Sequence, residues 1–248
     1  MLGHPSDVRQ IVSENLIPFL NPNTVIIDHT SSHPKQISDT AREKNCWAVD
    51  APVSGGDIGA KDGKLAILAS GNEHVVKWLN PLFDVWGKVT FVGGPGKGQS
   101  CKIMNQIVVG ATLLGLSEGL VFAEKAGLDK REFVERVKGG AAGSMVMELF
   151  GERMIGRDFR PGELTEYMVK DLGMGLEVGA EEGDDVVVLP GAALNKQMFT
   201  AMVANGDGKL GTQGLNTVIE RMNGNCRSGS YIGEFGFGYL NLSIIEDA

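Results

Sequence analysis

The spacing of apolar residues changes once along the chain, near Gly94, and this change limits the possible folds most. Before it, four apolar runs typical of β-strands alternate with polar segments, at residues 24–28, 46–53, 64–70 and 88–93. Strands separated by helices indicate a mainly parallel sheet covered by helices. The third run follows the second without a helix between them, so we expect one strand to be antiparallel.

After Gly94 the strand signals almost disappear, and apolar residues recur at the 3.6-residue period of a helix. We expect a long helix over about 99–125, followed by helices near 130–138, 143–154, 163–182, 191–204 and 212–222. The sequence therefore predicts an α/β part over 1–94 and an all-α part over 95–223. Residues 224–248 form an atypical tail, rich in glycine and aromatic residues, with no clear period.

Local signals set the expected helix ends in the α/β part. A helical pattern begins next to Ser6, which suits an N-cap. A polar helix is expected after Pro34, and another over 72–83, which Pro81 ends or kinks. The stretch that follows the second strand, up to residue 63, reads as a loop.

Composition excludes several functional classes. The chain of 248 residues has a formal net charge of −8 and no basic block, which argues against nucleic acid or an anionic membrane as partner. Cys46, Cys101 and Cys226 suit neither a disulfide framework nor a zinc site, and the histidines show no metal-binding spacing, so no metal is expected. No stretch reaches the roughly 20 apolar residues of a membrane helix. The first ten residues show no targeting pattern.

Two of the glycine patterns require separate interpretations. Gly206, Gly208 and Gly211 spell GxGxxG, but they follow a helix, whereas a dinucleotide site needs the motif to leave a strand. This pattern therefore predicts a turn between helices. Ser54, Gly55 and Gly56 follow an expected strand, where free backbone donors and a hydroxyl could hold a carboxylate or phosphate. An ordinary tight loop explains the same residues equally well.

The expected start of the long helix carries the most informative polar group. Glycines up to Gly98 allow close approach to the sheet, and Lys102, Asn105 and Gln106 then share one helix face. A lysine beside an asparagine in an otherwise uncharged helix suits general acid/base chemistry, although a solvated lysine remains the alternative. Lys170 and Asp171 lie among apolar residues on a later helix, where an exposed face is the alternative.

Taken together, five segments resemble the β-hydroxyacid dehydrogenase family, above all the plant 3-hydroxyisobutyrate dehydrogenase-like proteins. They are DHTSSHP (28–34), DAPVSGGDIGAKDGKLAILASG (50–71), KGQSCKIMNQ (97–106), EGLVFAEKAGL (118–128) and MVKDLGM (168–174). The resemblance implies a Rossmann-type NAD(P)-binding domain, joined by one long interdomain helix to an all-α substrate and dimerisation domain.

The resemblance also implies roles for individual residues. It makes Lys102 the catalytic acid/base. It places substrate contacts at Ser54, Gly55, Gly56, Asn105 and Asp171. It places contacts to NAD or NADP at Leu2, Gly3, Thr30, Ser31 and Lys170. Some family members carry the asparagine one residue later, where this chain has Gln106.

The implied activity is hydride transfer between a nicotinamide cofactor and a small 3-hydroxy acid or a related aldehyde or 2-oxo acid. A homo-oligomer formed through the helical domain, in the mitochondrion or the cytoplasm, is expected. Family members begin with a strand, a glycine-rich turn and a helix that this sequence does not contain. We therefore expect an N-terminally truncated form with an incomplete Rossmann-type sheet. The alternative is a catalytically incompetent form that dimerises with full-length relatives.

Overall fold

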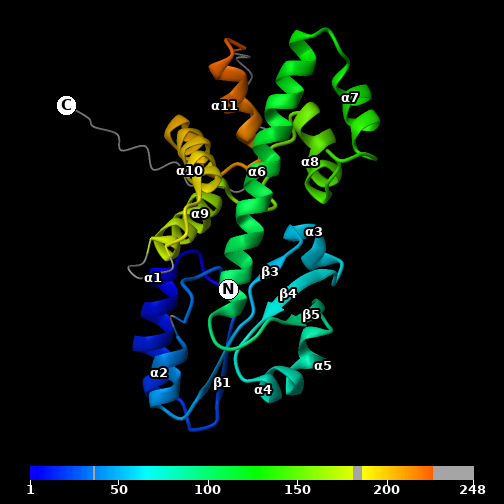
Figure 1. The fold of residues 1–248 in the computed structure, drawn as a ribbon. Helices are drawn as coiled ribbons and strands as arrows, with labels where there is room; N and C mark the ends of the chain where they lie inside the picture. The colour runs from blue at the N-terminus through cyan, green and yellow to red at the C-terminus, as the bar shows by residue number, and fades with distance from the viewer. Residues whose placement is uncertain (36, 181–185, 226–248) are drawn as a thin grey trace, which may run out of the picture.

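The fold was analysed in a computed structural model, which describes residues 1–35, 37–180 and 186–225. Figure 1 shows the strands and short helices gathered at one end, with the long helix α6 running from them through a group of helices. This arrangement is the predicted α/β part followed by an all-α part. Most of the predicted tail, including Cys226, lies outside the described residues.

The strands form two small sheets. In the first, β1 (Val25–Asp28) and β2 (Trp47–Asp50) are parallel, with Val25 opposite Trp47. In the second, β4 (Leu65–Ala69) lies between β3 (Val53–Ser54), to which it is antiparallel, and β5 (Gly87–Phe91), to which it is parallel. The predicted antiparallel strand is thus confirmed as β3. A bridge between Asp50 and Ser70 joins the two sheets.

The prediction of one strand over 46–53 was wrong, because β2 and β3 belong to different sheets. Ala51 and Pro52 separate them. Pro52 has no N–H to donate to a ladder, so regular pairing with a neighbouring strand is interrupted there. Its carbonyl instead accepts a hydrogen bond from the Leu68 N–H at 2.9 Å. At Pro52 the chain therefore stops pairing with β1 and begins to pair with β4.

The helices of the α/β part are short. They are α1 (Pro5–Val8), continued by a π-helical segment (Arg9–Leu16) and a 3-10 turn (Ile17–Phe19), then α2 (Ser38–Glu43), α3 (Gly56–Lys61), α4 (Glu73–Trp78) and α5 (Asn80–Phe83). Pro81 lies in the first turn of α5 and separates it from α4, as predicted. The loop expected before residue 63 was wrong in part, since it contains α3.

The predicted N-cap of the first helix was also wrong. The cap is His4, whose side chain accepts a hydrogen bond from the Ser6 N–H. Pro5 takes the first helical position, where a missing N–H costs nothing because that group has no intrahelical partner. The Asp7 carboxylate accepts a hydrogen bond from the His4 N–H in return. Ser6 therefore lies inside the first turn.

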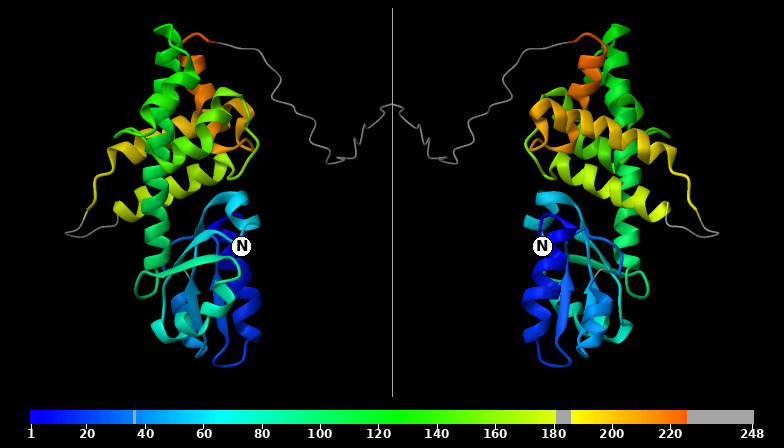
Figure 2. Two further views of the ribbon diagram at one scale, coloured as in Figure 1. Left: turned by 90° about the vertical axis from the view of Figure 1, so that its right-hand side faces the viewer. Right: turned by 90° about the vertical axis from the view of Figure 1, so that its left-hand side faces the viewer.

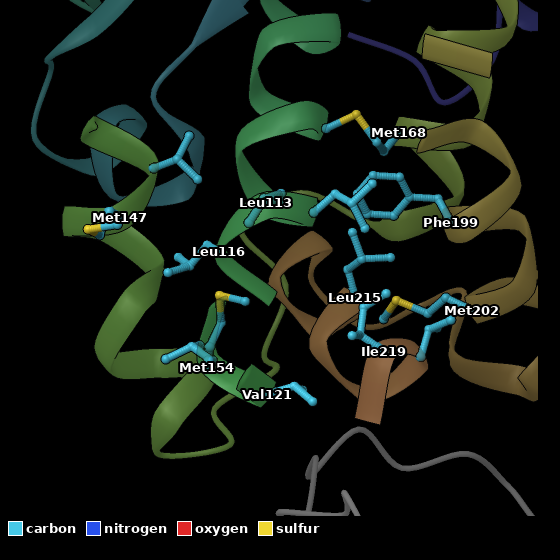
Figure 3. Close-up of a cluster of buried hydrophobic side chains, with 14 of the residues drawn as sticks. Leu113, Leu116, Val121, Met147, Met154, Met168, Phe199, Met202, Leu215 and Ile219 are labelled. Carbon is cyan, nitrogen blue, oxygen red and sulfur yellow. The ribbon is translucent and has the colours of Figure 1, made fainter. Parts of the chain in front are cut away.

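The helical part contains α6 (Lys97–Lys125), α7 (Lys130–Val137), α8 (Met145–Ile155), α9 (Thr165–Gly179), α10 (Pro190–Met202) and α11 (Leu215–Met222). All six were predicted, with shifted ends. Figure 3 shows the apolar core that they share, in which Leu113, Phe199 and Leu215 are fully buried. Gly206, at φ 87°, lies between α10 and the 3-10 turn Thr212–Gly214, which confirms the predicted turn between helices.

By length and composition, α6 could cross a membrane, contrary to the sequence-based expectation. One side of this helix is packed against the rest of the protein, however. Leu113, Leu116 and Leu120 are buried in the core that α6 shares with the surrounding helices. The length and hydropathy of α6 are therefore those of a central core helix.

The start of α6 is fixed to the strands by polar groups. The buried Asp50 carboxylate accepts hydrogen bonds from the N–H groups of Gly96 and Gln99, each at 3.1 Å. A negative charge at this end of a helix is favoured by the helix dipole. A Cβ on Gly98 would lie 2.5 Å from the Leu68 carbonyl oxygen, so only glycine allows this approach. The predicted close contact between glycines and sheet is thus confirmed.

Candidate active site

Lys102 lies in the N-terminal part of α6, on the side that faces α9. Its side chain is buried, and its Nζ donates a hydrogen bond to Gln106 Oε1 at 3.0 Å. Asn105 Nδ2 donates to the same oxygen, also at 3.0 Å. The predicted sharing of one helix face by these three side chains is confirmed. The solvated-lysine alternative is excluded, because Lys102 is only 8% exposed.

Gln106 connects this lysine to two acidic side chains. Its Nε2 donates hydrogen bonds to Glu163 Oε1 at 2.6 Å and to Asp171 Oδ2 at 2.9 Å. Carboxylates accept and ammonium groups donate, so the four partners fix which end of the amide faces which side. Gln106 is therefore the centre of the network, with donors on one side and acceptors on the other.

The residues expected to contact the cofactor lie together beside the first residues of α9. Lys170 Nζ donates to the Ser31 carbonyl at 2.8 Å, to Ser31 Oγ at 2.9 Å and to the Gly3 carbonyl at 3.4 Å. The Leu2 N–H donates to Thr30 Oγ1 at 2.7 Å. Figure 1 shows the start of the chain next to α9. All five residues are thus brought together, although Lys170 is more than one hundred residues from the other four in sequence.

Asp171 joins the two groups of residues. It is fully buried, and its Oδ1 lies 3.2 Å from Lys170 Nζ while its Oδ2 faces Gln106. The alternative of an exposed face for Lys170 and Asp171 is therefore excluded. Lys170 also lies over the Tyr167 ring, at 5.3 Å from its centroid. A buried ion pair that is also hydrogen-bonded on both sides holds its members in one geometry.

The Ser54–Gly56 segment reaches the same region from the second sheet. Ser54 Oγ donates a hydrogen bond to Asn105 Oδ1 at 3.5 Å. Gly55 and Gly56 have φ values of 133° and 63°, in the region that favours glycine. A Cβ on Gly55 would also lie 3.2 Å from the Leu65 side chain. The segment therefore needs its glycines to turn from β3 into α3 beside Asn105.

Glu163 is a member of the site that the sequence did not reveal. It lies in the loop before α9, and its only sequence signal is a carboxylate close to a helix start. Burial raises the pKa of its carboxyl group above the ordinary value of 4.5; the Asp171 charge acts in the same direction, and the Lys102 charge opposes it. Its contact to Gln106 spans 57 residues of sequence, so only the fold reveals it.

The described residues fit the nicotinamide end of NAD or NADP. Asp171 Oδ1 is buried and, apart from its ion pair with Lys170, accepts no hydrogen bond; Lys170 in turn contacts Ser31. Such an acceptor with remaining hydrogen-bonding capacity suits a ligand that carries amide and hydroxyl donors. Within the described part of the chain, the pattern GxGxxG occurs only at Gly206–Gly211, in a turn between helices.

Comparison with known proteins identifies the family. Residues 1–94 match the model described as the NAD binding domain of 6-phosphogluconate dehydrogenase. Residues 96–219 match the model described as NAD-binding of NADP-dependent 3-hydroxyisobutyrate dehydrogenase. The chain belongs to the β-hydroxyacid dehydrogenase family. Figure 2 shows the two matched parts, with α6 running from one into the other.

Individual relatives agree with this family. The chain is 53% identical over 229 residues to probable 3-hydroxyisobutyrate dehydrogenase-like 2, mitochondrial, of Arabidopsis thaliana, covering 90% of this chain and 74% of the relative. It is 39% identical over 201 residues to 2-hydroxy-3-oxopropionate reductase of Escherichia coli, covering 79% and 68%. The crystal structure of 3-hydroxyisobutyrate dehydrogenase from Salmonella typhimurium superposes with a TM-score of 0.77 at 25% identity, covering 88% and 77%.

These matches confirm several predictions for this β-hydroxyacid dehydrogenase. The fold is a Rossmann-type part followed by a helical part. The chain is an oxidoreductase of the 3-hydroxyisobutyrate dehydrogenase type, and its cofactor class is NAD or NADP. The roles of individual residues remain predictions, supported by the geometry described above.

Proposed function

We propose that this chain transfers hydride between NAD(P) and a small 3-hydroxy acid, or a related aldehyde or 2-oxo acid, with Lys102 as general acid/base. One observation carries the proposal. Lys102 is buried at the junction of the two parts, and Gln106 connects it to the ion pair of Lys170 and Asp171. An ammonium group held in this way can deliver a proton to a carbonyl oxygen placed beside it.

In the reducing direction, bound NADH or NADPH would supply the hydride that the carbonyl carbon receives. Lys102 Nζ gives its proton to the carbonyl oxygen, which becomes the hydroxyl oxygen of the product. Ser54, Gly55 and Gly56 hold the substrate carboxylate, and Asn105, which Ser54 contacts, anchors the substrate from α6. In the oxidising direction, Lys102 in its neutral form takes the hydroxyl proton.

Leu2, Gly3, Thr30, Ser31 and Lys170 would hold the cofactor, and Asp171 would support Lys170. On this proposal residues 1–94 form the NAD(P)-binding domain and residues 95–223 the substrate and dimerisation domain. The relatives from Arabidopsis thaliana carry mitochondrial names, and we propose the same compartment for this chain.

The experiment uses the purified chain with NADH or NADPH and glyoxylate, succinic semialdehyde or 3-oxo-2-methylpropanoate. We expect turnover of at least one aldehyde, and thermal stabilisation by one coenzyme. A second arm fuses the strand, glycine-rich turn and helix of the Arabidopsis relative to the N-terminus. If neither the chain nor the fusion binds coenzyme or turns over any aldehyde, the proposal is wrong.

A role in oligomers is a second candidate, favoured by the outer face of α6. Exposed residues recur on it at alternating steps of four and three: Met104, Val108, Ala111, Gly115, Glu118 and Phe122. This is the spacing at which one helix packs along another, and the small residues in the middle allow close approach. We propose that a second copy, or a full-length relative, packs on this face.

Size measurement tests the oligomer directly. Val108→Glu places a charge in the apolar half of this face, next to the small residues, and should give a monomer, whereas Glu135→Gln on α7 should leave the size unchanged. A wild-type chain that stays monomeric, both alone and when mixed with the full-length relative, would exclude this role.

A further inference from the structure

Glu163 lies between α3 and Gln106 of α6, both of which are far from it in sequence. Its neighbour Gly162 lies close to α3, since a Cβ on Gly162 would be 2.9 Å from Asp57 Oδ1. Asp57 directly follows the Gly55–Gly56 segment. On the other side, the Glu163 carboxylate contacts Gln106, which contacts Lys102. Residues 162–163 therefore lie near α3, which follows the expected carboxylate-holding segment, and the Glu163 carboxylate lies one contact away from Lys102.

The backbone around Glu163 is fixed. Its carbonyl accepts a hydrogen bond from the Thr212 N–H at 3.3 Å, and the next residue, Leu164, forms a bridge with Gly211. Thr165, one residue further, is fully buried and begins α9. A side chain on a segment held at both ends keeps its direction, as a group that discriminates between ligands must.

The carboxylate has capacity to bind more than Gln106. Its two oxygens together offer about four acceptor positions, whereas Gln106 uses one contact at Oε1. The charged groups around it are Lys102 on α6 and Asp171 and Lys170 on α9, with Asp57 of α3 near Gly162. A methyl group packed against this carboxylate would leave acceptors without partners, whereas a hydroxyl group would donate to one of them.

We infer that Glu163 is a specificity-determining residue. Among small 3-oxo and 3-hydroxy acids, it selects those with a hydroxyl group on the carbon between the carboxylate and the reacting carbon. Acids with a methyl group at that carbon are disfavoured. The inference rests on the proposed function, because it assumes that the substrate lies between Ser54 and Lys102. Since Glu163 is itself acidic, it also disfavours a second carboxylate at that carbon.

The kinetic test compares two aldehydes that differ only at this carbon, 2-hydroxy-3-oxopropanoate and 2-methyl-3-oxopropanoate. We expect the wild-type chain to prefer the hydroxylated aldehyde by about 10- to 100-fold in kcat/KM, the range for a hydrogen bond to a charged group. Glu163→Met, which keeps the length of the side chain, should remove most of this preference through a higher KM for the hydroxylated aldehyde. Glu166→Met is the matched control, because Glu166 contacts Lys209 instead.

A binding test needs no turnover. Without coenzyme, 2,3-dihydroxypropanoate and 3-hydroxy-2-methylpropanoate cannot react, so calorimetry gives their dissociation constants with the chain alone. The wild type should bind the dihydroxy acid more tightly, and Glu163→Met should bind both acids about equally. Glu163→Gln, which retains hydrogen-bonding groups, should keep part of the preference.

The outcomes separate the two proposals. If Glu163→Met weakens the binding of both acids by the same factor, Glu163 only supports Gln106 and the inference is wrong. An equal affinity of the wild type for the two acids also overturns it. If the binding preference is found and depends on Glu163, but neither aldehyde is turned over by the chain or by the fusion, the inference on binding stands and the proposed reaction fails.

Discussion

The helical part buries one continuous cluster of large apolar side chains, whereas the α/β part divides its apolar residues between two smaller clusters. Near the carboxyl ends of its strands, the α/β part instead buries a polar network with the start of α6: Asp28, Thr30, Ser32, Asp50 and Ser70, together with Gln99 of α6. Its members are hydrogen-bonded to one another: Ser32 Oγ donates to Asp28 Oδ2 at 2.7 Å, and Gln99 Nε2 donates to the Thr30 carbonyl at 2.7 Å.

The two interiors serve different purposes. Apolar burial is roughly proportional to area and has no direction, so the helical cluster contributes stability without fixing individual polar groups. Hydrogen bonds have direction, and leaving one buried partner unmade is costly. The polar network therefore fixes the start of α6, and with it Lys102, relative to the strands. The helical cluster thus mainly provides stability, whereas the polar network mainly provides site geometry. Four substitutions test this division.

Lys102→Met should have the largest effect, because Lys102 belongs to the site and to neither interior. We expect kcat to fall roughly 10²- to 10⁴-fold while the free energy of unfolding changes little. Steady-state kinetics and urea unfolding measure the two quantities. Lys125→Met, at the far end of the same helix, is the control. An unchanged kcat would remove Lys102 from the mechanism.

Phe199→Ala should have the next largest effect, on stability alone. Phe199 is 0% exposed in the helical core, and removing a buried phenylalanine costs about 3–5 kcal/mol. Phe19→Ala, at a residue 82% exposed, should change the free energy of unfolding by less than about 0.5 kcal/mol. Urea unfolding followed by circular dichroism measures both. Similar losses for the two variants would contradict the assigned core.

Asp50→Asn should lower the free energy of unfolding less than Phe199→Ala does, but it should also lower kcat. The carboxylate accepts hydrogen bonds from the N–H groups of Gly96 and Gln99 and from the Ser70 hydroxyl group. The NH2 group of an asparagine would face one of these donors and could not accept its hydrogen bond. We expect a loss of about 1.5–3 kcal/mol and a lower kcat, because the start of α6 shifts. Asp39→Asn, on the exposed face of α2, is the control. A stability loss with an unchanged kcat would show that the network does not position Lys102.

Glu163→Gln should have the smallest effect, visible as a change in pH dependence. The raised pKa means that the folded chain still holds this proton at pH values where the unfolded chain has released it. The contribution of Glu163 to stability therefore falls as pH rises above about 4.5, by at most about 1.4 kcal/mol per pH unit. The variant should lack this slope in unfolding experiments between pH 4.5 and 8. Identical slopes for variant and wild type would refute the raised pKa.

The periodicity of the sequence predicted four strand regions and the six helices after Gly94, because these apolar patterns depend on local spacing; only the region 46–53 divides into two strands. Short elements were less predictable. Three glycines within 56–63 lower helix propensity, which hid α3, and the role of Pro52 became clear only once β3 was seen to pair with β4. The Pro5 signal at the first helical position was present in the sequence and would have corrected the cap.

The site was predictable where its residues share an element and hidden where the fold joins distant segments. Lys102, Asn105 and Gln106 lie within two turns of α6, so their spacing revealed the common face. Glu163 lies in a loop, and no local pattern relates it to α6. The contacts of Lys170 to Ser31 and Gly3 likewise depend on how α9 packs against the α/β part.

The Gln106 amide keeps opposite charges apart. Its oxygen faces the ammonium group of Lys102, and its nitrogen faces the carboxylates of Glu163 and Asp171. Among the salt bridges of the described residues, none joins Lys102 to either carboxylate, whereas Lys170 pairs directly with Asp171. The neutral amide thus lies between the ammonium group and the carboxylates: the acids hold the amide in place, and on the proposed mechanism the Lys102 ammonium group keeps a proton for the reacting oxygen.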